Sequence, residues 1–179
     1  MRRRTHLAWL GSLAGLGVRA QTAPPPELAQ ALPGARLQGQ QRFRVWGFEV
    51  YDARLWTLPG FSATGYAQHA LALELNYLRE LKGQAIAERS LKEMRGVGSV
   101  PAELEPRWLA QMQQLLPDVR KGERLLGVQR PDEGAFFWFN GQPRGELRDA
   151  QFARLFFGIW LSPQTSEPAL RQALLGGVP

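Results

Sequence analysis

Two early segments of the chain alternate apolar and polar residues with the period of a β-strand. In ALALELNY, residues 70–77, the apolar side chains at odd positions from Leu71 to Tyr77 share one face, as in a strand with one buried side. The longer segment RFRVWGFEVYDARLWTL, residues 42–58, is rich in β-branched and aromatic residues and has apolar residues on both faces. It predicts one long strand, or two strands broken near Gly47, covered on both sides for part of their length.

The pattern changes to that of amphipathic helices at residues 83–96 and again at residues 106–117. In both segments apolar residues recur three and four positions apart, and a glycine or a proline marks the end. A third apolar stripe at the spacing of one helical face covers residues 152–160 and follows Asp149, whose side chain is a suitable N-cap. A last short helix is predicted over residues 168–175.

Three short strands separated by turn residues precede the third helix. They read ERLLGVQ, AFFWF and QPRGEL, and Asn140 and Gly141 between the last two can supply the positive φ angles of a tight hairpin. In AFFWF, residues 135–139, aromatic side chains point to both sides of the strand, unlike a strand with one face in water. We expect the apolar stripe of residues 152–160 to pack on one side of this strand as part of the core. The sequence does not indicate what covers the other side.

The order of elements is therefore strands, two helices, a meander and further helices. Strands and helices that are segregated in this way predict the α+β class, with a large, mostly antiparallel sheet packed against a helical layer. The chain has 179 residues, of which 44% are hydrophobic, and this suffices for one domain with a substantial core.

The first twenty residues differ in composition from the rest of the chain. They combine a basic start, an apolar stretch too short for a comfortable membrane span, and small residues up to Ala20, which is the layout of a secretory signal. We predict a periplasmic or secreted protein with a signal peptide at 1–20, a flexible Pro-rich leader at 21–31 and one domain at 32–179, without a stable membrane span after processing. An uncleaved membrane tether is the alternative, and the choice between Sec and twin-arginine export is open.

Charge and cysteine content exclude several classes of function. The formal net charge is +6, but four of the 22 basic residues lie in the signal segment, so 18 basic side chains face 16 acidic ones in the remainder. This near balance argues against a nucleic-acid partner. The chain has no cysteine, and after processing His69 is its one histidine, without ligand spacing around it. We expect no metal and no cofactor, and the oligomeric state stays open.

Several segments together carry a resemblance to a known family. They are RFRVWGFEVYDARLW, LLPDVRKGERLLGV, FFWFNGQPRGELRDAQFARLFFGIWLS and the terminal ALRQALLGG, which span about residues 32–176. In this order they resemble the bacterial, exported branch of the chalcone isomerase-like family. The resemblance implies the open-faced β-sandwich of chalcone isomerases, in which a large antiparallel sheet packs against a helical layer.

The resemblance implies two different activities. Plant members close a chalcone ring by intramolecular conjugate addition, with an arginine guanidinium that stabilises the substrate oxyanion without proton exchange. Related members without that chemistry bind fatty acids, with an arginine on the carboxylate and an apolar tunnel around the tail.

The strand motif of the plant enzymes is only partly present. When Val50 and Tyr51 are aligned with its valine and tyrosine, Trp46 stands at the position of a threonine and Glu49 at that of a glycine. A bulky indole in place of a small hydroxyl disfavours the plant reaction.

The candidate ligand-binding residues are Arg36, Arg44, Trp46, Phe48 and Tyr51. Arg36 resembles the segment that carries the plant arginine, and Arg44 lies closer to Tyr51. The favoured hypothesis is a binder of a small apolar anion, such as a fatty acid, in a cleft between sheet and helices. The alternatives are an isomerase, or intramolecular lyase, acting on a chalcone-like conjugated ketone through Arg36 or Arg44, and a non-catalytic assembly or interaction protein.

Overall fold

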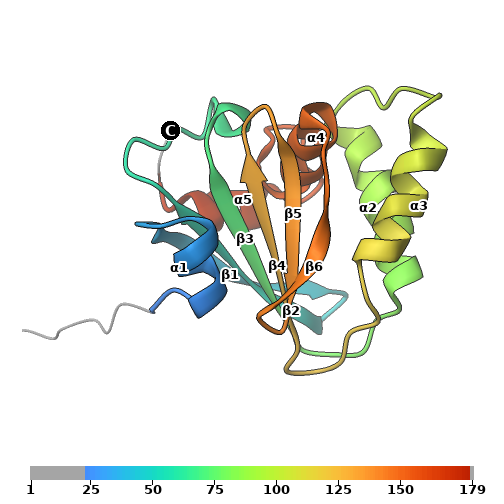
Figure 1. The fold of residues 1–179 in the computed structure, drawn as a ribbon. Coiled ribbons are helices and arrows are strands. Elements are labelled where there is room, and N and C mark those ends of the chain that lie inside the picture. Colours follow the sequence, from blue (N-terminus) through green and yellow to red (C-terminus); the bar gives the residue numbers. More distant parts are fainter. Residues whose placement is uncertain (1–22, 178–179) are drawn as a thin grey trace, which may run out of the picture.

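The computed structural model describes residues 23–177, which form a six-stranded sheet with helices on both faces (Figure 1). The strands are β1 (Arg36–Val45), β2 (Phe48–Thr57), β3 (Leu71–Tyr77), β4 (Arg124–Arg130), β5 (Gly134–Phe139) and β6 (Gln142–Leu147). They are hydrogen-bonded in sequence order, and every neighbouring pair is antiparallel. The predicted α+β class with a large antiparallel sheet is confirmed.

Two of the strand connections are tight two-residue hairpins. Trp46 and Gly47 join β1 to β2 with φ angles of 48° and 81°, and Asn140 and Gly141 join β5 to β6 with φ angles of 49° and 82°. Positive φ at both central residues is the mark of a type I′ turn, whose twist matches that of the flanking strands. Of the two alternatives for residues 42–58, the structure has the two strands broken near Gly47, and it confirms the predicted Asn-Gly hairpin.

Four helices cover one face of the sheet: α2 (Gly83–Val97), α3 (Glu105–Leu115), α4 (Ala150–Leu161) and α5 (Pro168–Leu175). A short 3₁₀ turn, η1 (Tyr66–Gln68), contacts α4.

Helix α4 forms the centre of this layer. The predicted cap at Asp149 is confirmed, because its carboxylate accepts hydrogen bonds from the backbone N–H groups of Gln151 and Phe152 at 2.9 and 3.0 Å. The buried Phe156 packs edge-to-face on Phe137 of β5, with ring centroids 5.5 Å apart. The apolar stripe of α4 thus covers one side of the AFFWF strand, as predicted.

The opposite side of that strand is covered by α1 (Pro26–Ala31), a helix that the sequence did not predict. Leu28 of this helix is fully buried in a second apolar cluster, which contains Phe136 of β5 and against which Trp138 packs. The buried carboxylate of Glu27 also forms an ion pair with Arg124 of β4.

The expected flexible leader is therefore wrong for residues 26–31. Pro26 occupies the first helical position, where a proline is well tolerated. Burial of Leu28 and the ion pair of Glu27 with Arg124 contribute to offsetting the entropy cost of ordering this short helix. The predicted signal peptide at residues 1–20 lies outside the described residues. Across residues 23–177, no helix has both the length and the apolar character needed to cross a bilayer.

Candidate functional site: an apolar cleft between the sheet and helix α2

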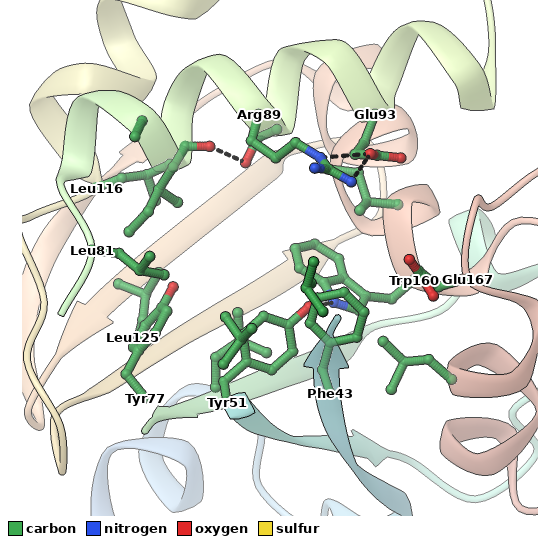
Figure 2. Close-up of a pocket in the computed structure, with 18 of the residues that line it drawn as sticks. Phe43, Tyr51, Tyr77, Leu81, Arg89, Glu93, Leu116, Leu125, Trp160 and Glu167 are labelled. Atoms are coloured by element: carbon green, nitrogen blue, oxygen red, sulfur yellow. Dashed lines mark hydrogen bonds and ion pairs between the residues drawn. The ribbon is translucent and has the colours of Figure 1, made fainter. Parts of the chain in front are cut away.

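A cavity of about 320 Å³ lies between the sheet and the helical layer, close to the β1–β2 hairpin (Figure 2). Strands β1 to β4 form one wall, and helices α2, α4 and α5 form the other. Its apolar and aromatic lining consists of Phe43, Val45, Val50, Tyr51, Leu75, Tyr77, Leu81, Ala85, Ile86, Leu116, Leu125, Phe156, Ile159, Trp160 and Leu170. Its polar lining consists of Arg79, Arg89, Ser90, Glu93, Ser166 and Glu167.

Aromatic side chains from three strands form the sheet wall of this cleft. Phe43 stacks on Tyr51 with ring centroids 5.0 Å apart, and Tyr51 meets Tyr77 edge-to-face at 6.0 Å. The Tyr51 hydroxyl accepts a hydrogen bond of 3.1 Å from the indole Nε1–H of Trp160 on α4, so this contact ties sheet to helix across the cleft. Burial raises the pKa of Tyr51 and of Tyr77 above the ordinary value. Both phenols consequently stay neutral at physiological pH.

The polar groups of α2 gather at one edge of the cleft. Arg89 donates from Nε to the Glu93 carboxylate at 2.7 Å, one helical turn away, and Ser166 donates to the other oxygen of that carboxylate at 2.7 Å. The Arg89 side chain is 59% exposed, whereas that of Glu93 is 16% exposed. Figure 2 shows this pair above the aromatic floor, with Glu167 at the same edge. The edge therefore carries charges of both signs, and the interior is apolar.

A second arginine reaches the cleft from the loop after β3. The guanidinium of Arg79 lies over the ring of Phe48, with its carbon 5.5 Å from the ring centroid. Among the ion pairs found within residues 23–177, none includes Arg79. Its donors are therefore available to an anionic group at the cleft edge.

The charged groups that line the cleft are two arginines and two glutamates. No histidine or lysine is among the described residues that line the cleft. Within residues 23–177, no three His, Cys, Asp or Glu side chains are grouped as a metal site. An apolar interior with a few charged groups at one edge is typical of a site that holds an elongated apolar molecule with a polar end.

Of the five residues predicted to bind ligand, the structure places only Tyr51 in the cleft. Trp46 and Phe48 lie at the β1–β2 hairpin, with 94% and 63% of their surface exposed. Arg36 is exposed at the start of β1, far along the strand from the hairpin. The five residues do not form one site.

Strand alternation explains the position of Arg44. In β1 the side chains of Phe43 and Val45 face the cleft, so Arg44 between them faces the opposite side. There it pairs with Glu49 at 2.9 Å. Hydrogen bonds from Arg42 and Arg44 hold the pKa of Glu49 below its ordinary value. The isomerase interpretation through Arg36 or Arg44 is therefore not supported, because neither arginine reaches the cleft.

The sequence interpretation missed the residues that give the cleft its character. Arg89 and Glu93 belong to the amphipathic helix predicted over residues 83–96, and Trp160 to the apolar stripe of residues 152–160, and neither pattern marks them as cleft residues. Arg79 stands between the end of β3 and α2 without a local pattern around it. Only the packing of α2 and α4 over β1–β3 brings these residues around one cavity.

Comparisons with known proteins agree with this architecture. The profile of the family described as chalcone isomerase-like matches residues 38–176. An uncharacterized protein of Haemophilus influenzae is 32% identical over 136 residues, which cover 74% of this chain and 64% of that protein. The chain thus spans less than two thirds of the length of that relative.

A solved structure with a similar fold comes from a plant. The crystal structure of a fatty-acid binding protein of Arabidopsis thaliana superposes with a TM-score of 0.62 and covers 80% of this chain and 87% of its own. The sequence identity is 10%, so this likeness concerns the fold.

Proposed function

The chain belongs to the chalcone isomerase-like family and has its fold, and from this premise we propose that it binds an apolar molecule with an anionic head group, such as a fatty acid. The observation that carries the proposal is the apolar cleft under α2, with arginines only at its edge. The plant protein of similar fold, which is described as fatty-acid binding, adds support.

The cleft suits a short or medium-length chain. Its volume of about 320 Å³ is at the low end of the range for small-molecule sites, about 300–1,000 Å³. The acyl chain would pack against Leu75, Leu125 and Phe156, whose side chains line the interior. Removal of this apolar surface from water would supply most of the affinity.

The two arginines at the edge differ in their suitability for a carboxylate. Glu93 already occupies the Nε–H of Arg89, so a ligand would have to compete with an internal carboxylate that Ser166 also holds in place. Arg79 has no such competitor among the described residues, and its guanidinium lies over the ring of Phe48. We therefore assign the carboxylate to Arg79 rather than to Arg89.

Filling the cleft tests the proposal directly. Dodecanoate and its methyl ester would be titrated into the wild type, Ile86→Trp and Lys92→Trp, with affinity measured by calorimetry. Ile86 lines the cleft, whereas Lys92 is exposed on the same helix and does not. We expect Ile86→Trp to weaken both ligands tenfold or more and Lys92→Trp to weaken neither. Equal affinity in all three proteins would refute binding in this cleft.

Head-group selectivity tests the role of the arginine. Arg79→Gln should weaken dodecanoate by about fivefold, in line with about 1 kcal/mol for an exposed charge pair, and leave the methyl ester unchanged. Arg89→Gln serves as the matched comparison and should have a smaller effect, because Glu93 already uses its donors. If Arg89→Gln weakened dodecanoate binding more than Arg79→Gln does, the carboxylate would be assigned to Arg89 instead.

We also propose that the protein is exported to the periplasm or secreted. The basic and apolar first twenty residues support this, with cleavage after Ala20. N-terminal sequencing of the protein from fractionated host cells is the test. A start at Gln21 in the soluble exported fraction is expected, and an intact Met1 in the membrane fraction would favour an uncleaved tether.

A further inference from the structure

The β1–β2 hairpin ends in an apolar tip that none of residues 23–177 covers. We call residues 45–48 the hairpin tip. Trp46 is 94% exposed and Phe48 is 63% exposed, and within residues 23–177 no other large hydrophobic side chain is exposed to this degree. A single exposed apolar residue needs no explanation, but two large aromatic side chains at one apex suggest a contact outside the chain.

The backbone of the hairpin tip is also unfavourable for the residue that it carries. Trp46 has a φ of 48°, in the left-handed region that bulky residues rarely occupy. At the equivalent position of the β5–β6 hairpin, Asn140 has a φ of 49°, and asparagine is well tolerated there. The chain thus keeps an exposed indole where a small polar residue would be more stable. Such a local penalty is typical of positions held for function.

The hairpin tip lies next to the edge of the apolar cleft. Val45 of the tip lines the cleft, and so does Val50 at the start of β2. Arg79, which also lines the cleft, lies over the ring of Phe48. A surface that contacted the tip would consequently face the same edge of the cleft.

We propose that the hairpin tip inserts into the interfacial layer of a lipid bilayer. Trp46 and Phe48 together expose at most a few hundred Å², because an aromatic side chain offers about 150–250 Å². This is well below the roughly 800 Å² per partner of a standard protein interface. Tryptophan favours the head-group level of membranes, where its ring is apolar and its N–H stays hydrated.

Apolar insertion rather than charge is the driving force. Arg42 and Arg44 behind the tip are neutralised by Glu49 and Asp52 in one hydrogen-bonded network. In the part of the chain that the structure describes, Arg79 is the further cation that contacts the tip. Binding should therefore occur on zwitterionic lipid and change little with salt, unlike the attachment of a polybasic surface.

Trp46→Asn is the decisive variant, because it removes the indole and relieves the backbone. Wild type and variant, purified with the same N-terminus, would be sedimented with phosphatidylcholine vesicles in 0.15 M and 1 M NaCl. We expect the partition coefficient to fall at least tenfold in Trp46→Asn at both salt concentrations. Thermal stability equal to or above that of wild type would exclude misfolding as the cause. Fluorescence of the wild type should also be quenched by brominated lipid more strongly than that of the variant.

Two results would overturn membrane insertion. One is equal vesicle binding by wild type and Trp46→Asn. The other is a wild-type dimer in light scattering that Trp46→Asn converts to a monomer, since the tip would then contact a second copy of the chain. Titration of Trp46→Asn with dodecanoate in solution tests ligand binding separately from membrane insertion. Because Trp46 does not line the cleft, the affinity of this variant for dodecanoate should equal that of the wild type.

Discussion

The two tight hairpins of the sheet have the same backbone and opposite surroundings. Both have a glycine at the second central position with φ near 80°, and at the first position the φ angles of Trp46 and Asn140 differ by only one degree. The β5–β6 hairpin has the residue that the turn favours. The β1–β2 hairpin has one of the residues that the turn favours least.

Their contacts explain the difference. Asn140 accepts a hydrogen bond of 2.9 Å from the backbone N–H of Arg124, so its side chain also fastens β5 to β4. Trp46 is almost fully exposed and makes no comparable contact with the described residues. At the β5–β6 hairpin the turn residue suits the backbone and also makes a contact within the fold. At the β1–β2 hairpin the turn residue violates the local preference, and its side chain is free for the proposed membrane contact.

The largest expected effect comes from truncating Leu28 of α1, the helix that covers one side of β5 in the second hairpin. Leu28→Ala should lower the free energy of unfolding by about 2–5 kcal/mol, because it opens a cavity between α1 and the Phe136 side of β5. Denaturant unfolding measures the change. Gln30→Ala, at an exposed position of the same helix, is the control and should change the free energy by less than about 0.5 kcal/mol. If Leu28→Ala changed the free energy of unfolding as little as Gln30→Ala does, packing of α1 on the sheet would not contribute to stability.

A smaller loss is expected when the exposed indole is copied into the second hairpin. Asn140→Trp should lower the free energy of unfolding by about 2 kcal/mol, since it puts a bulky residue at positive φ and removes the acceptor for the Arg124 N–H. Asn140→Asp keeps both the acceptor and the tolerance of positive φ and should unfold close to wild type. If Asn140→Trp left the free energy of unfolding unchanged, backbone strain would not distinguish Trp46 from Asn140.

The reciprocal change should have the smallest effect and the opposite sign. Trp46→Asn is expected to raise the free energy of unfolding by about 0.5–1 kcal/mol, because asparagine is tolerated in the left-handed region and no buried contact is lost. The same denaturant titration detects the gain. A clear loss of stability would mean that Trp46 packs within the chain, contrary to its exposure.

Secondary structure was largely predictable because the patterns were long and regular. The alternation of residues 70–77 and the stripe of residues 152–160 have the periods of a strand and of a helix, so periodicity identified the type of both elements. The expected single buried side of β3 is wrong, because Ala72 and Glu74 on its other face are buried as well. Helix α1 was not predictable in this way. It has six residues and begins within a run of prolines, and it is stabilised by the packing of Leu28 in the apolar cluster that contains Phe136.

The candidate site was less predictable than the fold. The segment RFRVWGFEVY lies along the cleft, since Phe43, Val45, Val50 and Tyr51 line it, but of the five residues predicted to bind ligand only Tyr51 is among them. The predicted arginines, Arg36 and Arg44, do not line the cleft, whereas Arg79 and Arg89 do. Nothing in the sequence distinguishes Arg79 at the cleft edge from Arg44 in an ion pair on the opposite face, because that distinction depends on which face of β1 the helices cover.

By itself, the amino-acid sequence determined the class of the fold, the succession of strands and helices after α1, the tight Asn-Gly turn and the cap of α4. These features depend on residues close together in the chain, whose spacing and backbone preferences act locally. Only the tertiary structure decided which face of each strand is covered, that α1 closes the second side, and that Arg79 and Arg89 meet at one apolar cleft. Those outcomes depend on contacts between distant segments, where burial of apolar surface outweighs local preference.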